Sequence, residues 1–348
     1  MFFSAPLIAI VAQALVVLAH PGHSDLLERH ELEALERRQS DVLKCRSTLQ
    51  ARHEPRLARM HEKRDEILRR QGMGSGSGTT AKATATAVTS VLSTFPTTTS
   101  GAVPASQTTQ ASDGACVLSP QQEEGPFYVA GEALRENLIE NQPGIPFYLE
   151  FSLIDTNTCA PLVNAAVDIW SCNSTGEYAG FISSDTAPYN TSLYSGDVQH
   201  VGDKNDAGST ITDNKTFLRG QQLTDSSGNA KFTTLIPGWY SGRTAHIHVR
   251  VHVGGTVTTN GTYTGGSLTH TGQTFFGEDF YSKVANVYPY TLDTKTRTTN
   301  DQDRPWTQQN GKYGAWNLYY VVNGDITKGI IGFQTLAVDS KATGQNGV

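Results

Sequence analysis

Two histidines separated by one residue, His246 and His248, are the side chains whose types and spacing most suggest chemistry. They fall in a segment where apolar and polar residues alternate, and alternate side chains of a β-strand share one face. Both imidazoles therefore project together, close enough to bind one metal ion. Histidine pairs also occur on ordinary solvated strand faces, so the neighbouring residues must decide between the two interpretations.

The neighbouring residues supply two phenols and a positive charge. Arg243 precedes His246 by three residues, and Tyr240 precedes Arg243 by three. A second tyrosine, Tyr178, follows a strand-like segment that ends at Trp170. Phenolate is a hard anionic donor that stabilises ferric iron, and imidazole also suits iron. A phenol ordinarily loses its proton at about pH 10, but a trivalent cation at bonding distance eases that loss. Two phenols and two imidazoles are therefore a suitable donor set for Fe(III).

Short strands must position these side chains. Apolar or alternating runs predict six of them, at residues 147–154, 165–170, 230–235, 245–253, 316–322 and 330–338. Turn-forming residues separate the runs, as at Asp225–Gly228 and Val322–Asp325. Residues 254–271 look like a long loop. Because no helical periods lie between the strands, the pattern favours a mostly β domain, either a sandwich or a barrel.

The chain before this domain is organised differently. Residues 1–19 are uncharged and largely apolar, which predicts a cleaved signal peptide; a membrane anchor is the alternative, but the run barely reaches bilayer length. Residues 20–72 predict a helical segment, either an arm packed on the domain or a pro-segment removed at one of its dibasic pairs. Residues 73–114 are rich in Thr, Ser and Ala and predict a disordered linker. The β domain is expected to span residues 115–348.

Other features of the sequence agree with secretion. Four Asn-x-Ser/Thr sequons occur, at Asn173, Asn190, Asn214 and Asn260. After signal cleavage no membrane contact is expected. The net charge of −6 comes without a basic stripe, so no nucleic-acid partner is expected.

The four cysteines are an even number, which suits two disulfides in an oxidising compartment. Cys159 and Cys172 flank a strand-like segment, so we predict that they pair with each other. That pairing leaves Cys45 with Cys116. Three connectivities are open to four cysteines, and sequence alone does not choose among them.

Five pieces of the sequence resemble the intradiol ring-cleavage dioxygenases, in particular their secreted fungal members. The pieces are Glu124–Tyr128, Asp168–Tyr178, Phe217–Gly220, Thr224–Gly228 and Pro237–His248, which lie within residues 116–338. The resemblance implies an antiparallel β-sandwich. It also implies an enzyme that opens catechol-type rings between the two hydroxyls with O₂ and gives muconate-type diacids. The N-terminal region does not clearly match the family's helical dimerisation arm, so a homodimer stays an open alternative.

The resemblance also implies roles for individual residues. The four ligands of a non-haem Fe(III) would be Tyr178, Tyr240, His246 and His248. Tyr240 would be the ligand that leaves when the substrate chelates the metal. Arg243 would stabilise negative charge on the bound ring. Gln273 would be a polar residue of the substrate pocket, and Tyr128 would line the pocket mouth.

Three other functions stay open. A cupin barrel also carries His-x-His on a strand, but it supplies an acidic residue soon afterwards, and none occurs from Val249 to Gly255. Cleavage after Ala19 would expose His20 near His23, a pattern that suits Cu(II) and another kind of metal oxidase. The third is a secreted sandwich that binds phenolic compounds or surface glycans without catalysis. Oxygen uptake would distinguish it from an enzyme.

Overall fold

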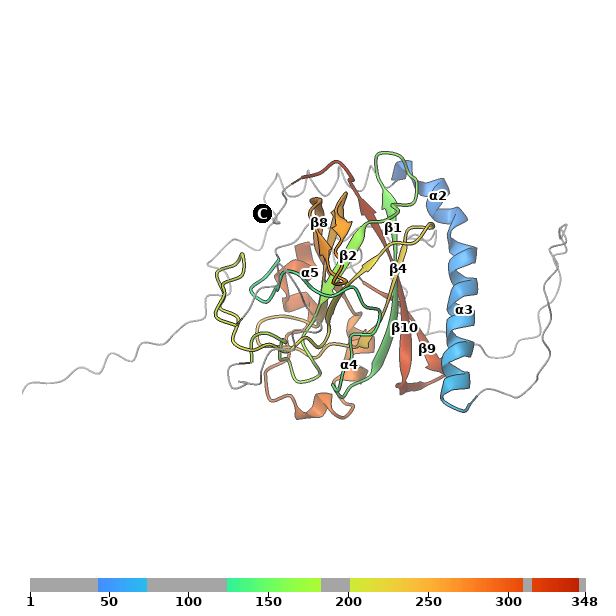
Figure 1. Cartoon of the computed structure of the whole chain (residues 1–348). Coiled ribbons are helices and arrows are strands. Elements are labelled where there is room, and N and C mark those ends of the chain that lie inside the picture. The colour runs from blue at the N-terminus through green and yellow to red at the C-terminus, as the bar shows by residue number, and fades with distance from the viewer. Residues whose placement is uncertain (1–42, 74–123, 183–200, 309–314, 344–348) are drawn as a thin grey trace, which may run out of the picture.

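The computed structural model describes residues 43–73, 124–182, 201–308 and 315–343. Within these residues two four-stranded sheets pack face to face, which makes the domain a β-sandwich (Figure 1). Several predictions fall outside the described residues: the signal peptide, the linker beyond Met73, His20, His23, Cys116 and Asn190.

The first sheet has the strand order β4–β1–β10–β9. Its strands are β1 (Pro146–Asp155), β4 (Asn229–Leu235), β9 (Asn317–Val322) and β10 (Asp325–Val338). Strands β1 and β10 run parallel, and the other two pairs are antiparallel. The first sheet is therefore mixed, and the predicted antiparallel arrangement holds for the rest of the sandwich.

The second sheet is antiparallel throughout, with the order β3–β2–β5–β8. Its strands are β2 (Ala166–Trp170), β3 (Arg219–Leu223), β5 (His246–Val253) and β8 (Ser267–Phe275). A small hairpin of β6 (Thr256–Val257) and β7 (Tyr263–Thr264) connects β5 to β8. The long loop predicted for residues 254–271 is therefore wrong, because this segment contains the hairpin and the first half of β8.

The hydrophobic core lies between the two sheets. Alternate residues of β1 and β5 point inward, namely Phe147, Leu149, Phe151 and Leu153 of β1 and Ile247, Val249 and Val251 of β5. Burying such a side chain stabilises the fold by about 1.5–3 kcal/mol relative to leaving it exposed. Because the inward positions of β5 are apolar, its polar residues lie on the outward face of the second sheet. This alternation fixes which side of the sandwich carries the histidines.

Short helices follow β8 along the chain. They are α4 (Glu278–Val284), the 3₁₀ turns η2 (Tyr290–Leu292) and η3 (Asn300–Gln302), and α5 (Arg304–Gln308). Among the residues that the structure describes, no helix is both long and apolar enough to cross a membrane.

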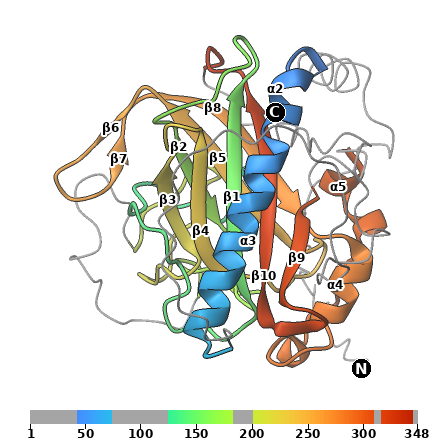
Figure 2. The ribbon, with the colours of Figure 1, turned by 90° about the vertical axis from the view of Figure 1, so that its right-hand side faces the viewer.

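The N-terminal arm, α2 (Arg46–Ala51) and α3 (His53–Arg70), packs on the domain. Helix α3 lies across β1 and β10 on the outward face of the first sheet (Figure 2). Met60 and Ile67 are buried against that sheet, and Arg59 forms an ion pair with the buried Glu150, with 2.6 Å between Nη2 and Oε1. The described part of residues 20–72 is thus packed as the arm alternative expects. Its removal as a pro-segment stays untested.

A disulfide joins the arm to the sandwich, and its pairing differs from the prediction. Cys45, next to α2, bonds to Cys159 in the turn between β1 and β2. Cys172 is a buried free thiol. The predicted Cys159–Cys172 bond is wrong because these residues lie at opposite ends of β2, and a strand rises about 3.3 Å per residue. A segment that cysteines flank in sequence thus holds them apart in space.

Removing this disulfide should destabilise the protein. The bond closes a loop with a sequence separation of 114 residues. The double variant Cys45→Ser/Cys159→Ser is therefore expected to lower the free energy of unfolding by about 2–5 kcal/mol. Urea unfolding of the variant and the wild type measures the difference, with Cys172→Ser as the control for loss of a buried sulfur outside the bond. Equal unfolding midpoints for double variant and wild type would contradict the prediction.

Candidate metal centre

The outward face of the second sheet gathers the predicted ligands. His246 and His248 project from β5 on this face and are only 2% and 1% exposed. Trp170 at the end of β2 stacks flat on the His248 ring, with 4.7 Å between ring centroids and 6° between planes. Loops that follow β2 and precede β5 bring Tyr178 and Tyr240 to the same place.

The four side chains converge on one point. The Nε2 atoms of His246 and His248 are 3.1 Å apart, and Tyr240 Oη is 3.5 Å from His246 Nε2. The Tyr178 ring centroid is 5.9 Å from the Tyr240 ring and 6.2 Å from the His248 ring. The structure therefore brings together all four residues that the sequence predicted as ligands.

The histidines present their lone pairs to this point. His246 Nδ1 lies 2.6 Å from the carbonyl oxygen of Thr244, so Nδ1 carries the proton and Nε2 is left free to bind. Burial, reinforced by the charge of Arg243, lowers the pKa of His246 to about 3. Burial and the neighbouring His246 lower the pKa of His248 well below its usual range. Both imidazoles are therefore neutral at pH 7, as metal binding requires.

The surroundings of the two tyrosines disfavour loss of the phenol proton. Burial, reinforced by the neighbouring Tyr240, raises the pKa of Tyr178 well above its usual value. Burial also raises the pKa of Tyr240, against the charge of Arg243, which lowers it. Tyr178 Oη is buried and has no hydrogen-bond partner among the described residues, an arrangement that costs about 1–3 kcal/mol. A cation bound between the four side chains would satisfy this oxygen and favour both phenolates.

The donor chemistry fits ferric iron better than a softer or larger ion. Among the described residues no three His, Cys, Asp or Glu side chains gather as a metal site, so the tyrosines are needed to complete the set. Two hard phenolate oxygens and two imidazoles suit Fe(III). The residues present therefore fit the metal that the resemblance implies.

Arg243 and Gln273 lie beside the four donors. Arg243 Nη1 is 3.5 Å from Tyr240 Oη, and its Nη2 contacts Gln273 Oε1. Gln273 lies on β8 directly opposite His248 on β5. The strand pairing thus places Gln273 next to the four donors.

Comparison with solved structures identifies the fold. The intradiol ring-cleavage dioxygenase from Tetranychus urticae matches with a TM-score of 0.54 and 29% sequence identity, and the match covers 66% of this chain and 98% of that one. The described domain has the fold of an intradiol ring-cleavage dioxygenase. The predicted β-sandwich is thereby confirmed, and the secreted fungal type stays a prediction.

One further match agrees with the intradiol dioxygenase fold. A second solved dioxygenase matches with a TM-score of 0.53 and 29% identity over 66% of this chain and 98% of its own. Catechol 1,2-dioxygenase from Pseudomonas arvilla is more distant, with a TM-score of 0.40 and 18% identity over 65% of this chain and 66% of its own. A scan against protein-family models and a search of curated proteins gave no match.

Tyr128 does not have the place in this intradiol dioxygenase fold that the sequence predicted. Its side chain is only 5% exposed, and its hydroxyl donates to Asp168 Oδ2 at 3.1 Å. The Arg250 guanidinium lies 4.2 Å from its ring centroid. Tyr128 therefore lies inside a buried polar cluster and does not line a pocket mouth.

The aromatic residue beside the donors is Phe127. Its ring stacks on Tyr178, with 4.5 Å between centroids, and meets Tyr240 edge to face at 5.9 Å. The same Gly-Pro-aromatic motif contains Phe127 and Tyr128, and because the chain turns at Pro126 and Phe127 the two rings have different neighbours. The motif therefore correctly indicated an aromatic residue near the four donors. The sequence alone does not show which of its two aromatic residues faces them.

The loop that carries Tyr178 is packed closely on the segment that carries Tyr240. Gly176 has a φ of +77°, and a Cβ added to it would lie 1.9 Å from the carbonyl oxygen of Trp239. Asn173 Oδ1 accepts hydrogen bonds from the backbone N–H groups of Thr175 and Glu177.

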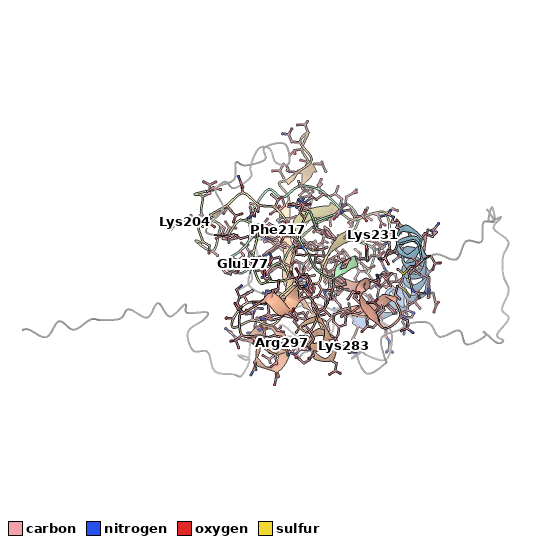
Figure 3. The ribbon with its side chains drawn as sticks, turned by 90° about the horizontal axis from the view of Figure 1, so that it is seen from below. Glu177, Lys204, Phe217, Lys231, Lys283 and Arg297 are labelled. Carbon is pink, nitrogen blue, oxygen red and sulfur yellow. A yellow bond between two sulfur atoms is a disulfide. The ribbon has the colours of Figure 1, made fainter. Side chains whose placement is uncertain are left out.

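Figure 3 shows Glu177 of this loop on the opposite side of the molecule from α3. The candidate metal centre and the N-terminal arm are thus on different faces of the sandwich.

Gly176→Ala should disrupt this contact. A left-handed backbone costs a non-glycine residue about 1–2 kcal/mol, and the clash with Trp239 requires one of the two loops to shift as well. We expect a lower melting temperature and loss of metal binding, because both tyrosines move. Gly254→Ala is the matched control, since Gly254 has a φ of +83° but open space around its Cβ position. Similar losses of metal in both variants would show that backbone strain alone, and not the loop contact, is responsible.

Proposed function

We propose that the chain is a non-haem Fe(III) dioxygenase that opens catechol-type rings between the two hydroxyls with O₂ and forms muconate-type diacids. The observation that carries this proposal is that Tyr178, Tyr240, His246 and His248 lie close enough together to bind one metal ion. The 29% identity to a solved intradiol dioxygenase over nearly the whole of that chain supports it.

The geometry supports a separate role for each of these residues in the proposed reaction. The two neutral histidines and the two tyrosines would hold the metal, and the Thr244 carbonyl keeps His246 in the correct tautomer. Ferric iron held there would supply a Lewis-acidic centre that chelates both catechol oxygens and makes the ring reactive toward O₂. Tyr240 is the more exposed tyrosine and faces Arg243, so it would leave the metal and accept a substrate proton at Oη. Arg243 would then face the negative charge of the bound ring.

We also propose that the protein is secreted. The disulfide between Cys45 and Cys159 supports this, because structural disulfides persist in oxidising compartments. Asn260 is an exposed sequon, whereas the Asn173 side chain is engaged within its own loop. Sequencing the N-terminus of protein recovered from culture medium should find His20 first. A protein retained in cells with an intact N-terminus would contradict the proposal.

The decisive experiment is an anaerobic visible spectrum of the purified protein, combined with iron analysis. A tyrosinate-to-iron band that shifts when catechol is added would establish the ferric centre and direct substrate binding. Admitting O₂ should then yield a diacid that carries both atoms of labelled oxygen by mass spectrometry. His252→Ala, on the same strand as the ligands but outside the cluster, is the matched control and should behave as the wild type. A protein that stays iron-free after ferric reconstitution would leave the non-catalytic binding function instead.

A further inference from the structure

Asp303 is a buried carboxylate beside the candidate metal centre that no sequence pattern singled out. It lies between η3 and α5 and is 0% exposed. Its Oδ2 accepts hydrogen bonds from Arg243 Nε at 2.8 Å and from the backbone N–H of Thr244 at 2.9 Å. Its Oδ1 accepts a hydrogen bond from the backbone N–H of Trp306 at 2.9 Å. Both carboxylate oxygens are therefore engaged, and the orientation of the group is fixed.

The segment that carries Asp303 is itself anchored. Asn300 accepts a hydrogen bond from Thr244 Oγ1 at 2.6 Å and donates one to the carbonyl oxygen of Phe276 at 2.9 Å. The backbone N–H of Asn300 donates to Glu278 Oε2 at 3.0 Å. Asp303 is thus held against the Arg243–Thr244 segment by contacts that do not involve Arg243.

The guanidinium of Arg243 is planar, so fixing two of its corners directs the third. Asp303 holds the Nε corner, and Gln273 holds the Nη2 corner. The remaining nitrogen, Nη1, faces Tyr240 Oη at 3.5 Å. Without Asp303 the guanidinium would keep two side-chain acceptors, the amide of Gln273 and the hydroxyl of Tyr240, and no carboxylate among these partners. A guanidinium that is only 15% exposed would then lack its counter-ion.

We propose that Asp303 is a positioning residue that aims Arg243 Nη1 at the oxygen atoms that react, namely Tyr240 Oη and the substrate oxygen that takes its place. This inference rests on the proposed function and assigns a residue that the reaction needs in addition to the metal ligands. Asp303 touches neither the donors nor the substrate position and acts through Arg243.

The first test compares Asp303→Asn with Asp301→Asn. Asp301 is an exposed carboxylate two residues away that does not contact Arg243, so its variant makes the same chemical change on the same turn. Loss of a charge-assisted hydrogen bond predicts a fall in kcat/KM of about 10- to 100-fold for Asp303→Asn and none for Asp301→Asn. Iron content and the resting visible band should stay unchanged, because the four donors are untouched. A loss of iron parallel to the loss of activity would mean a merely structural role and would overturn the proposal.

The second test is a double-mutant cycle with Arg243→Gln. If Asp303 acts through Arg243, adding Asp303→Asn to Arg243→Gln should lower kcat/KM by less than about threefold, because the group that it positions is already gone. Multiplying effects would show that Asp303 acts independently and would overturn the proposal. If Asp303→Asn does not fold, Asp303→Glu replaces it, since it keeps the charge but displaces the guanidinium; a substrate affinity equal to that of the wild type would then count against the proposal.

Failure of this inference is distinguishable from failure of the proposed function. A wild-type protein that turns over catechol while Asp303→Asn equals Asp301→Asn refutes the positioning role alone. A wild-type protein that binds iron but cleaves no ring refutes the dioxygenase function. In that case anaerobic titration with 4-nitrocatechol tests the positioning, and it should show about tenfold weaker binding to Asp303→Asn than to Asp301→Asn. Equal affinities would overturn the inference on this route too.

Discussion

His246→Ala should abolish stoichiometric iron binding and lower kcat/KM for catechol by more than about 100-fold, since losing even a supporting partner of a metal ligand can cost that much. The imidazole is 2% exposed, and the Thr244 carbonyl fixes its tautomer, so its Nε2 is a preformed donor. Alanine leaves no donor at that position. The neighbouring His248 cannot move into the empty position, because its ring stacks on Trp170.

The measurement is iron per protein, together with the tyrosinate-to-iron band, before and after ferric reconstitution. His252→Ala is the control, because it removes an imidazole from the same strand without touching the cluster. Circular dichroism of both variants separates loss of metal from loss of fold. An alanine variant at position 246 that binds iron normally and turns over catechol would show that the site is wrongly assigned.

The sequence predicted the strands whose apolar residues alternate and missed those whose residues are polar. Strands β1, β2, β4, β5, β9 and β10 all lie within the predicted runs or extend them by a few residues. Strand β3 reads Arg-Gly-Gln-Gln-Leu, and β8 is dominated by Thr, Gly and polar residues. Both lie beside β2 or β5 in the second sheet, whose outward face carries the candidate site and its buried polar residues. The polar residues on this face therefore interrupt the alternation of apolar and polar residues by which a strand is predicted from sequence.

Local patterns predicted the four candidate ligands that the structure brings together, whereas the contacts made by Asp303 and by the disulfide depend on the tertiary fold. The two histidines share a face because of strand geometry, which two residues of sequence determine. Asp303 meets Arg243 from 60 positions away along the chain. The Cys45–Cys159 bond likewise depends on how the arm crosses the first sheet. Pairings of this kind have no periodicity or motif from which they could be predicted.

The two tyrosines should respond differently to replacement by phenylalanine. Tyr178 is 3% exposed, stacks on Phe127, and has no hydrogen-bond partner for its Oη among the described residues. Tyr178→Phe removes a donor that nothing else can replace, so we expect a severe loss of iron. Tyr240 is less buried, and its Oη faces Arg243. Tyr240→Phe should retain iron on the other three donors and still bind catechol.

The expected cost of Tyr240→Phe is in turnover. Without Oη the variant would lack the group that we propose as acceptor of a substrate proton, and loss of such a proton acceptor lowers kcat by about 100-fold. Iron content, anaerobic catechol titration and single-turnover kinetics separate the three effects. Each variant keeps its aromatic ring and therefore its contact with Phe127, so any difference between the variants reflects the missing hydroxyl and not the packing of the ring. Equal iron loss in both variants would mean that the two tyrosines are equivalent permanent ligands. Tyr240 would then not be the ligand that leaves, and Arg243 would face the substrate alone.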